Sequence, residues 1–173
     1  MSTEAFDFVN EICQELGRRV EDDGIETLSE PERVASDVWW ASGIIQNGGF
    51  QYFYEGATEM AQVADSYDRL GLNKAAEACR KSLRIFPNGV PPEDDDERSE
   101  ILAPYQGFRN EFFRPLNLVL WETADEGLED ILAVFIHENL PSFGGFGLMD
   151  RHAHKFKEAL DRWIASLEDP EPE

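Results

Sequence analysis

Apolar residues in this chain recur at helical spacing, and this periodicity limits its fold more than any other feature. The clearest case opens at Ser29-Glu30-Pro31-Glu32, where Ser29 and Glu32 have the spacing of a capping box. Pro31 occupies a first-turn position, at which no amide donor is missed. The apolar face that follows is made of Val34, Val38, Ala41 and Ile45, widened by Trp39, Trp40 and Ile44. The pattern predicts an amphipathic helix that ends at Asn47-Gly48-Gly49.

Similar patterns predict helices in most of the remaining chain. The predicted ranges are Thr3–Glu21, Ala57–Leu70, Asn73–Phe86, Arg98–Leu102, Gly107–Trp121 with a break near Pro115, Leu128–Leu140, and a last helix from Met149 or Asp150 through Leu167. Residues 87–92 and 141–147 read as loops, and residues 50–54 fit either an extended piece or one helical turn. No long segment has the period of a strand. We therefore expect an all-α fold, a single compact domain of about seven helices over residues 1–167. Residues 168–173 form an acidic tail that we expect to be disordered.

Composition is compatible with one packed core. Apolar residues make up 42% of the 173 residues and include 12 Phe and 4 Trp. The N-terminus lacks the basic start and apolar core of a signal peptide, and no long apolar run exists, so we expect a cytoplasmic protein that does not enter a membrane. Cys13 and Cys79 both lie on apolar helical stripes, which predicts buried, reduced thiols.

Residues typical of enzyme sites do not occur in the required arrangements. His137, His152 and His154 lack the spacing of a zinc-binding pair, because residues two apart on a helix face different directions. No Ser lies in a nucleophile elbow, and the glycine-rich pieces lack the Lys-Ser/Thr of a phosphate loop. We expect neither an enzyme nor a metal or cofactor site.

The formal net charge is −21, from 36 acidic and 15 basic residues. Such a field repels nucleic acid and anionic membranes and attracts basic proteins. Spread evenly, the acids would lie roughly 15 Å apart, whereas duplex DNA carries a charge every ~1.7 Å of axis. Only clustered carboxylates could therefore resemble DNA. Three clusters have close spacing: Glu21, Asp22, Asp23 and Glu26; Glu93, Asp94, Asp95, Asp96 and Glu97; and Glu122, Asp125, Glu126, Glu129 and Asp130. Each alone also fits a solvated face. The segment Lys74–Arg84 is the one locally basic stretch.

The segment from Asp37 to Tyr54 resembles a signature of a bacterial domain-of-unknown-function family whose best-known member is a DNA mimic. Its core is Asn47-Gly48-Gly49-Phe50-Gln51-Tyr52-Phe53, following a helix that contains Trp40. Weaker similarity continues through the helices at 75–86 and 128–143. The resemblance implies an all-helical fold, a homodimer, and signature residues with a structural role as a turn and buried aromatic side chains. It also implies a carboxylate surface that occupies the DNA site of a transcription factor.

Three functions fit these observations. The leading hypothesis is a DNA-mimic regulator of transcription, whose clustered carboxylates bind the DNA-binding surface of a basic protein without binding nucleic acid itself. The second is another acidic binding module, such as an immunity or inhibitor protein for a basic toxin or enzyme. The third is a small-ligand-binding helical domain with a merely solubilising acidic surface. A deep pocket lined by Trp40, Phe50 and Tyr52, within the aromatic region Trp39–Tyr54, would favour the third.

Overall fold

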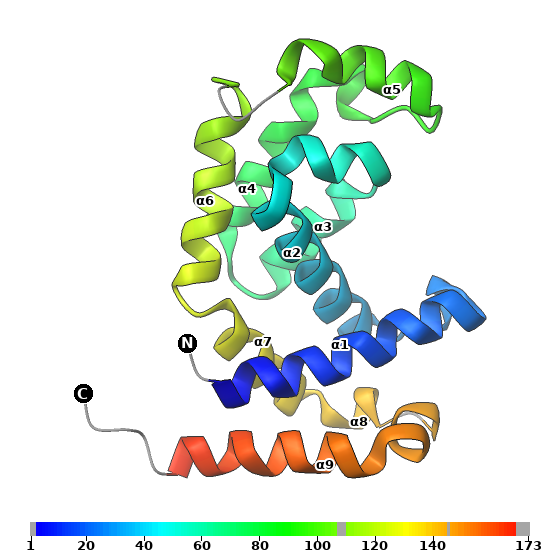
Figure 1. The fold of residues 1–173 in the computed structure, drawn as a ribbon, viewed down its shortest axis with the longest axis vertical. Coiled ribbons are helices and arrows are strands. Elements are labelled where there is room, and N and C mark those ends of the chain that lie inside the picture. The colour runs from blue at the N-terminus through cyan, green and yellow to red at the C-terminus, as the bar shows by residue number, and fades with distance from the viewer. Residues whose placement is uncertain (1–2, 107–109, 145, 169–173) are drawn as a thin grey trace. The chain divides into compact units, whose positions relative to one another are not determined.

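The computed structural model describes residues 3–106, 110–144 and 146–168, and within these ranges the chain is helical without a strand. The α-helices there number nine (Figure 1). They are α1 (Thr3–Asp23), α2 (Glu30–Gly56), α3 (Met60–Arg69), α4 (Asn73–Ser82), α5 (Asp95–Leu102), α6 (Phe113–Asp125), α7 (Leu128–Glu138), α8 (Leu140–Phe143) and α9 (Phe146–Glu168). Short 3-10 helices cover Ile25–Thr27, Leu83–Ile85, Pro87–Gly89 and Ala103–Tyr105. The all-α fold class is confirmed.

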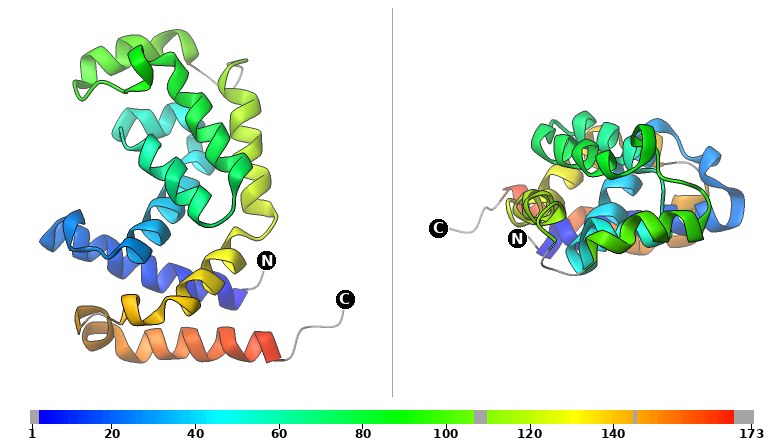
Figure 2. Two further views of the ribbon diagram at one scale, coloured as in Figure 1. Left: turned by 180° about the vertical axis from the view of Figure 1, so that it is seen from behind. Right: turned by 90° about the horizontal axis from the view of Figure 1, so that it is seen from above.

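The chain divides into two compact units. Unit 1 comprises residues 1–36 and 127–173, and unit 2 comprises residues 37–126. Within unit 1, α1 packs against both α9 and α7, and α1 and α9 run side by side in both Figures 1 and 2. Within unit 2, α4 packs against α3 and α6. That residues 1–167 act as one domain stays a prediction.

Each unit has its own aromatic core. In unit 1 the buried Phe8 ring stacks on Trp163, with centroids 5.3 Å apart and planes 6° from parallel. In unit 2 the buried Phe50 and Tyr54 both contact Phe113, with centroid separations of 6.1 and 6.3 Å. Aromatic side chains contribute large apolar areas, so these contacts give each unit a core of its own.

Each unit also contains one buried free cysteine, as the sequence predicted. Cys13 lies in α1 and Cys79 in α4. Burial raises the pKa of the Cys79 thiol to about 12 and raises the pKa of the Cys13 thiol further. Both thiols therefore stay neutral and unreactive while their unit is folded.

Several predicted helix boundaries were wrong. The helix expected to end at residues 47–49 continues to Gly56, and residues 50–54 are helical. Residues 140–143 form the short helix α8 instead of a loop, because Pro141 lies in its first turn, where proline is tolerated. The last helix begins at Phe146, before the predicted Met149. Pro115 likewise lies in the first turn of α6 and causes no break. Helix count rises from about seven to nine in the described ranges for these reasons.

Some predictions fall on residues that the structure does not describe. The helix predicted from Gly107 has its first three residues outside the described ranges. The acidic tail is similar: Glu168 ends α9, and residues 169–173 lie outside the description. In the described part of the chain, no helix is both long and apolar enough to cross a membrane.

Candidate functional site

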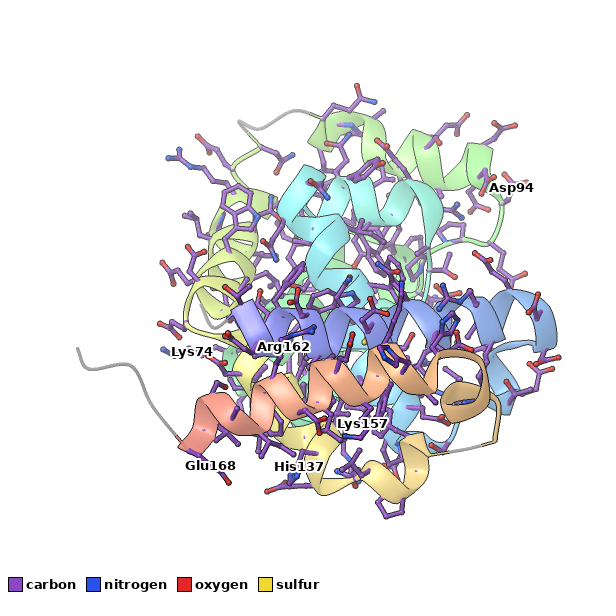
Figure 3. All side chains as sticks on the ribbon, turned by 60° about the horizontal axis from the view of Figure 1, so that its bottom comes forward. Lys74, Asp94, His137, Lys157, Arg162 and Glu168 are labelled. Carbon is purple, nitrogen blue, oxygen red and sulfur yellow. The ribbon has the colours of Figure 1, made fainter. Side chains whose placement is uncertain are left out.

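The acidic cluster of residues 93–97 opens helix α5. All five side chains are exposed. Asp94 (labelled in Figure 3) is the N-cap. Its carboxylate accepts a hydrogen bond from the Glu97 amide at 2.9 Å. Asp95 pairs with Arg98. Among the described residues no cation pairs with the carboxylates of Glu93, Asp96 or Glu97, so these three are available to a partner.

A buried arginine holds this cluster in place. Arg98 is only 5% exposed. Its Nε donates to the carbonyl of Tyr54 at 2.7 Å, and its Nη1 donates to the carbonyl of Pro92 at 2.6 Å. The guanidinium thereby ties the loop before α5 to the end of α2. The sequence signal for this role is a single Arg at the end of an acidic run, and its spacing predicts only a position in a helix.

The cluster of Glu21, Asp22, Asp23 and Glu26 lies at the end of α1 and on the 3-10 helix that follows. All four side chains are exposed. Three lie in or next to the last turn of α1, which has no basic residue. The C-terminal end of a helix carries partial negative charge, so carboxylates there are unfavourable by about 0.3–1 kcal/mol each. Local helix stability therefore does not explain this cluster, whereas it does explain the acids at the start of α5.

The third cluster spans the turn between α6 and α7. Glu122, Asp125, Glu126 and Asp130 are exposed, while Glu129 is half-buried and its Oε2 has no hydrogen-bond partner among the described residues. Asp125 ends α6, whose last turn also lacks a basic residue, and Glu129 lies in the first turn of α7. Gly127, at φ 102°, makes the left-handed turn between the helices. This cluster therefore places acids at the C-terminal end of α6, where the helix dipole disfavours them, and in the first turn of α7, where the dipole favours them.

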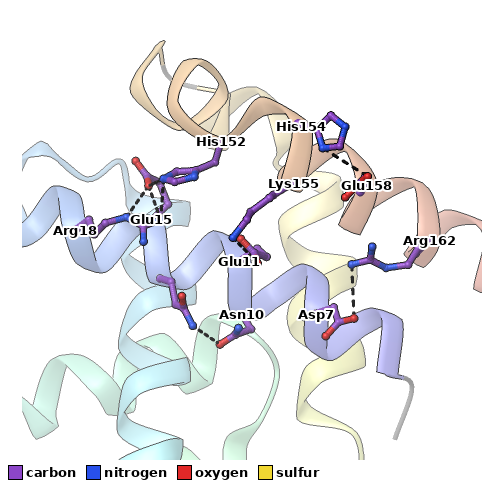
Figure 4. Close-up of polar contacts among 11 residues, drawn as sticks. Asp7, Asn10, Glu11, Glu15, Arg18, His152, His154, Lys155, Glu158 and Arg162 are labelled. Atoms are coloured by element: carbon purple, nitrogen blue, oxygen red, sulfur yellow. Dashed lines mark hydrogen bonds and ion pairs between the residues drawn. The ribbon is translucent and has the colours of Figure 1, made fainter.

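Other carboxylates are used inside unit 1 and were not singled out from the sequence. Along α1, Asp7 pairs with Arg162, Glu11 with Lys155 and Glu15 with His152, at 3.6, 4.0 and 3.0 Å (Figure 4). Glu15 is 1% exposed. Spacing of four residues places these acids on one face of the helix. They therefore belong to the contact between α1 and α9.

The basic segment Lys74–Arg84 is partly neutralised by its own unit. Arg80 pairs with Asp65 and Asp68 of α3 at 2.6 and 2.7 Å, and Lys81 pairs with Glu77 at 2.7 Å. Lys81 and the nearby Arg84 lower the pKa of Glu77. Arg80 thus joins α4 to α3, and Lys81 pairs within α4 itself. These pairs neutralise part of the positive surface that the sequence indicated.

The Asn47–Phe53 segment forms a kink in α2. Gly49 has φ 77° and ψ −177°, and a Cβ there would lie 2.6 Å from the side-chain nitrogen of Asn117. A Cβ on Gly48 would meet the Cβ of Tyr52 at 2.4 Å. The Phe50 amide, freed by the kink, donates to Asn117 Oδ1 at 3.0 Å. The two glycines are therefore required by backbone conformation and by close approach.

The aromatic residues of this segment are buried only in part. Phe50 and Phe53 are buried, at 0% and 4% exposure. Trp40 and Tyr52 are 45% and 53% exposed, so the expectation that both are buried was wrong. The inward-packed face of α2 is narrower than the pattern of apolar residues suggested. A helix that packs on one face leaves the residues at the edges of that face in solvent.

Next to the kink lies a cavity of about 440 Å³. The α2 side is made of Asn47, Gly48, Gln51, Tyr52 and Glu55. The opposite wall comes from Tyr105, from Asn110, which precedes α6, and from Phe113, Arg114 and Asn117 of α6. Of the three side chains proposed to line a pocket, Tyr52 does, Phe50 is packed in the core, and Trp40 is not part of the lining. The α6 residues were missed because they are some 60 positions away, and only the fold brings them to α2.

The model of the DMP19-like protein family matches residues 26–139. The chain belongs to the DMP19-like protein family. No curated protein and no solved structure matched the chain. The matched region contains all of unit 2, with the Asn47–Phe53 kink, the cavity and the residue 93–97 cluster. That the Asn47–Phe53 motif itself marks the family stays a prediction.

Proposed function

We propose that this member of the DMP19-like family is a DNA mimic, whose clustered carboxylates bind the DNA-binding surface of a basic protein such as a transcription regulator. The observation that carries the proposal is the residue 93–97 cluster. Glu93, Asp96 and Glu97 are exposed, lack an ion-pair partner in the described chain, and lie on a short segment fixed by the buried Arg98. Carboxylates on a fixed backbone segment lose little conformational entropy on binding. Duplex DNA, which is also rigid, has the same property.

A second argument comes from the helix ends. Exposed acids at the ends of α1 and α6 oppose the helix dipole, in turns with no basic residue. Binding of a basic partner would relieve that repulsion. The acids at the ends of α1 and α6, which helix stability does not explain, are therefore further candidate partner contacts besides residues 93–97, whereas the α1 acids that pair with α9 are not.

The test uses the full chain as bait in a low-salt extract, followed by binding measurements with the purified captured protein. We expect a protein with a basic DNA-binding surface, competition by duplex DNA, and an affinity that falls steeply with salt because counterions are released. Capture of a basic protein that duplex DNA does not displace would instead support an immunity- or inhibitor-type module. Recovery of no DNA-binding protein would end the mimic proposal.

Charge variants locate the surface. The triple variant Glu93→Gln, Asp96→Asn, Glu97→Gln removes the unpaired carboxylates and keeps the Asp94 cap and the Asp95–Arg98 pair. The matched control, Glu111→Gln, Glu138→Gln, Glu168→Gln, changes the net charge equally at exposed acids outside the clusters. We expect the logarithmic salt slope to fall by about one for each carboxylate that makes a contact in the cluster variant. Equal losses in both triples would mean that charge acts without a defined surface.

A further inference from the structure

The cavity between α2 and α6 is separate from the acidic clusters and has different chemistry. It holds about 440 Å³, within the ~300–1,000 Å³ of small-molecule sites. Glu55 is the one acidic side chain among the described lining residues, and Arg114 faces the same space. The described lining therefore has one acidic and one basic side chain, whereas the whole chain has 36 acidic and 15 basic residues. The cavity is thus less negative than the average of the protein.

Two amide side chains at this cavity have their orientation fixed by the backbone. Asn117 Oδ1 accepts from the Phe50 amide at 3.0 Å. Asn110 Oδ1 accepts from the amides of Phe112 and Phe113 at 2.7 and 3.0 Å. Each carbonyl oxygen thus faces backbone donors, and the Asn117 Nδ2 lies beside Gly49, 2.6 Å from the position of a Cβ there. Both side chains line the cavity, and these hydrogen bonds fix their orientation in its wall.

The same wall is electropositive. Asn110 precedes α6, a 13-residue helix whose N-terminal end carries partial positive charge. The Arg114 side chain, one residue after the start of that helix, lines the cavity and has no ion-pair partner in the described chain. A guanidinium and a helix N-terminus, beside two polar amide side chains, match the oxygens of an anion.

The remaining walls are aromatic. Tyr52, Tyr105 and Phe113 all line the cavity, and Phe113 is buried while the Tyr52 ring is half in solvent. Aromatic faces favour stacking on a planar ring. Gly48 keeps this space open, since a Cβ there would displace Tyr52.

We propose that the cavity beside the α2 kink binds a small aromatic anion, with the ring against Tyr52 and Tyr105 and the anionic group held by Asn110, Asn117 and Arg114. The anionic group is a carboxylate or a phosphate. This site lies apart from the carboxylate clusters and goes beyond the proposed mimic function, so either proposal can fail without the other.

The experiment titrates the full chain with 4-hydroxybenzoate, with phenyl phosphate and with the neutral 4-hydroxybenzamide, and follows the backbone amide resonances of Gly48, Phe50 and Asn117. We expect saturable shifts at these residues with one or both anions. The affinity for the neutral amide should be lower by a factor of about ten or more. The stronger of the two anions identifies carboxylate or phosphate as the anionic group. Shifts elsewhere, no saturation with either anion, or equal binding of the amide would overturn the proposal.

Two isosteric variants separate binding from folding. Asn110→Asp and Asn117→Asp each keep the oxygen that accepts the backbone hydrogen bonds and replace the Nδ2 donor by a charged oxygen. Asp is as good a helix cap as Asn, so thermal stability should be retained in Asn110→Asp. We expect both variants to lose about tenfold or more in affinity for the anion. The control Asn10→Asp makes the same charge change in α1, at a residue that is not part of the cavity lining. Unchanged binding in both cavity variants, or an equal loss in the control, would refute the site.

Discussion

Units 1 and 2 use their charged residues in different ways. In unit 1, acids of α1 pair with cations of α9, and the buried Glu15 lies 2.7 Å from Arg18 and 3.0 Å from His152. In unit 2, the three polar contacts of longest sequence separation join a side chain to the backbone: Arg98 to Tyr54, Asn117 to Phe50, and Trp121 to Ile45. Consequently, acids of α1 contribute to the fold, whereas Glu93, Asp96 and Glu97 can be changed with little effect on stability. Net charge alone does not distinguish the two kinds of acid.

The largest effect should follow from removing the buried guanidinium of unit 2. Arg98→Met leaves the carbonyls of Tyr54 and Pro92 without their donor, and we expect a loss of about 3 kcal/mol in the free energy of unfolding. Urea unfolding measures it, and thiol labelling of Cys79 should accelerate more than labelling of Cys13.

The control is Arg114→Gln, an exposed arginine of the same unit, which should change stability by less than ~0.5 kcal/mol. Equal acceleration at Cys13 and Cys79 in Arg98→Met would mean that the two units open together, and would remove the basis for treating them separately.

The second prediction concerns the kink. Gly49→Ala places a Cβ at positive φ and 2.6 Å from Asn117, and should destabilise unit 2 by about 2 kcal/mol. Gly43→Ala is the matched control in the same helix, because nothing lies within 4 Å of its Cβ position. That change should stabilise by up to ~1 kcal/mol, since alanine has the higher helix propensity. Urea unfolding of both variants is the measurement, and a loss of stability in both would show that the kink is not the cause.

The third prediction returns to unit 1. Glu15→Gln keeps the side-chain shape but removes the charge that Arg18 and His152 face, and we expect a loss of about 1.5 kcal/mol. Thiol labelling should accelerate at Cys13 more than at Cys79, the reverse of Arg98→Met. The exposed Glu138→Gln, also in unit 1, serves as the control and should leave both rates unchanged.

Helical periodicity was sufficient to predict the fold class and most helix positions, because it reflects which face each helix buries. The capping signal at residues 29–32 was half right: the Ser29 amide donates to Glu32 at 2.8 Å, but the buried Ser29 hydroxyl has no hydrogen-bond partner among the described residues. Boundaries near Gly49 and Pro141 were wrong because glycine and proline are compatible with a kinked or newly started helix as well as with a loop. The cavity could not be predicted, since its α2 and α6 walls meet only through tertiary packing. The role of Arg98 was hidden for the same reason.

The smallest effects should come from the exposed pairs between α1 and α9. The Asp7–Arg162 and Glu11–Lys155 pairs are 3.6 and 4.0 Å long, and their side chains are 31–66% exposed. Exposed pairs contribute about 0.2–1 kcal/mol, since water and salt screen them. A double-mutant cycle with Glu11→Gln and Lys155→Met should therefore give a coupling below ~0.5 kcal/mol that vanishes at high salt. A coupling above ~1 kcal/mol that persists in salt would show that charge pairs stabilise unit 1 beyond Glu15, and that its acids are more strictly structural than their exposure indicates.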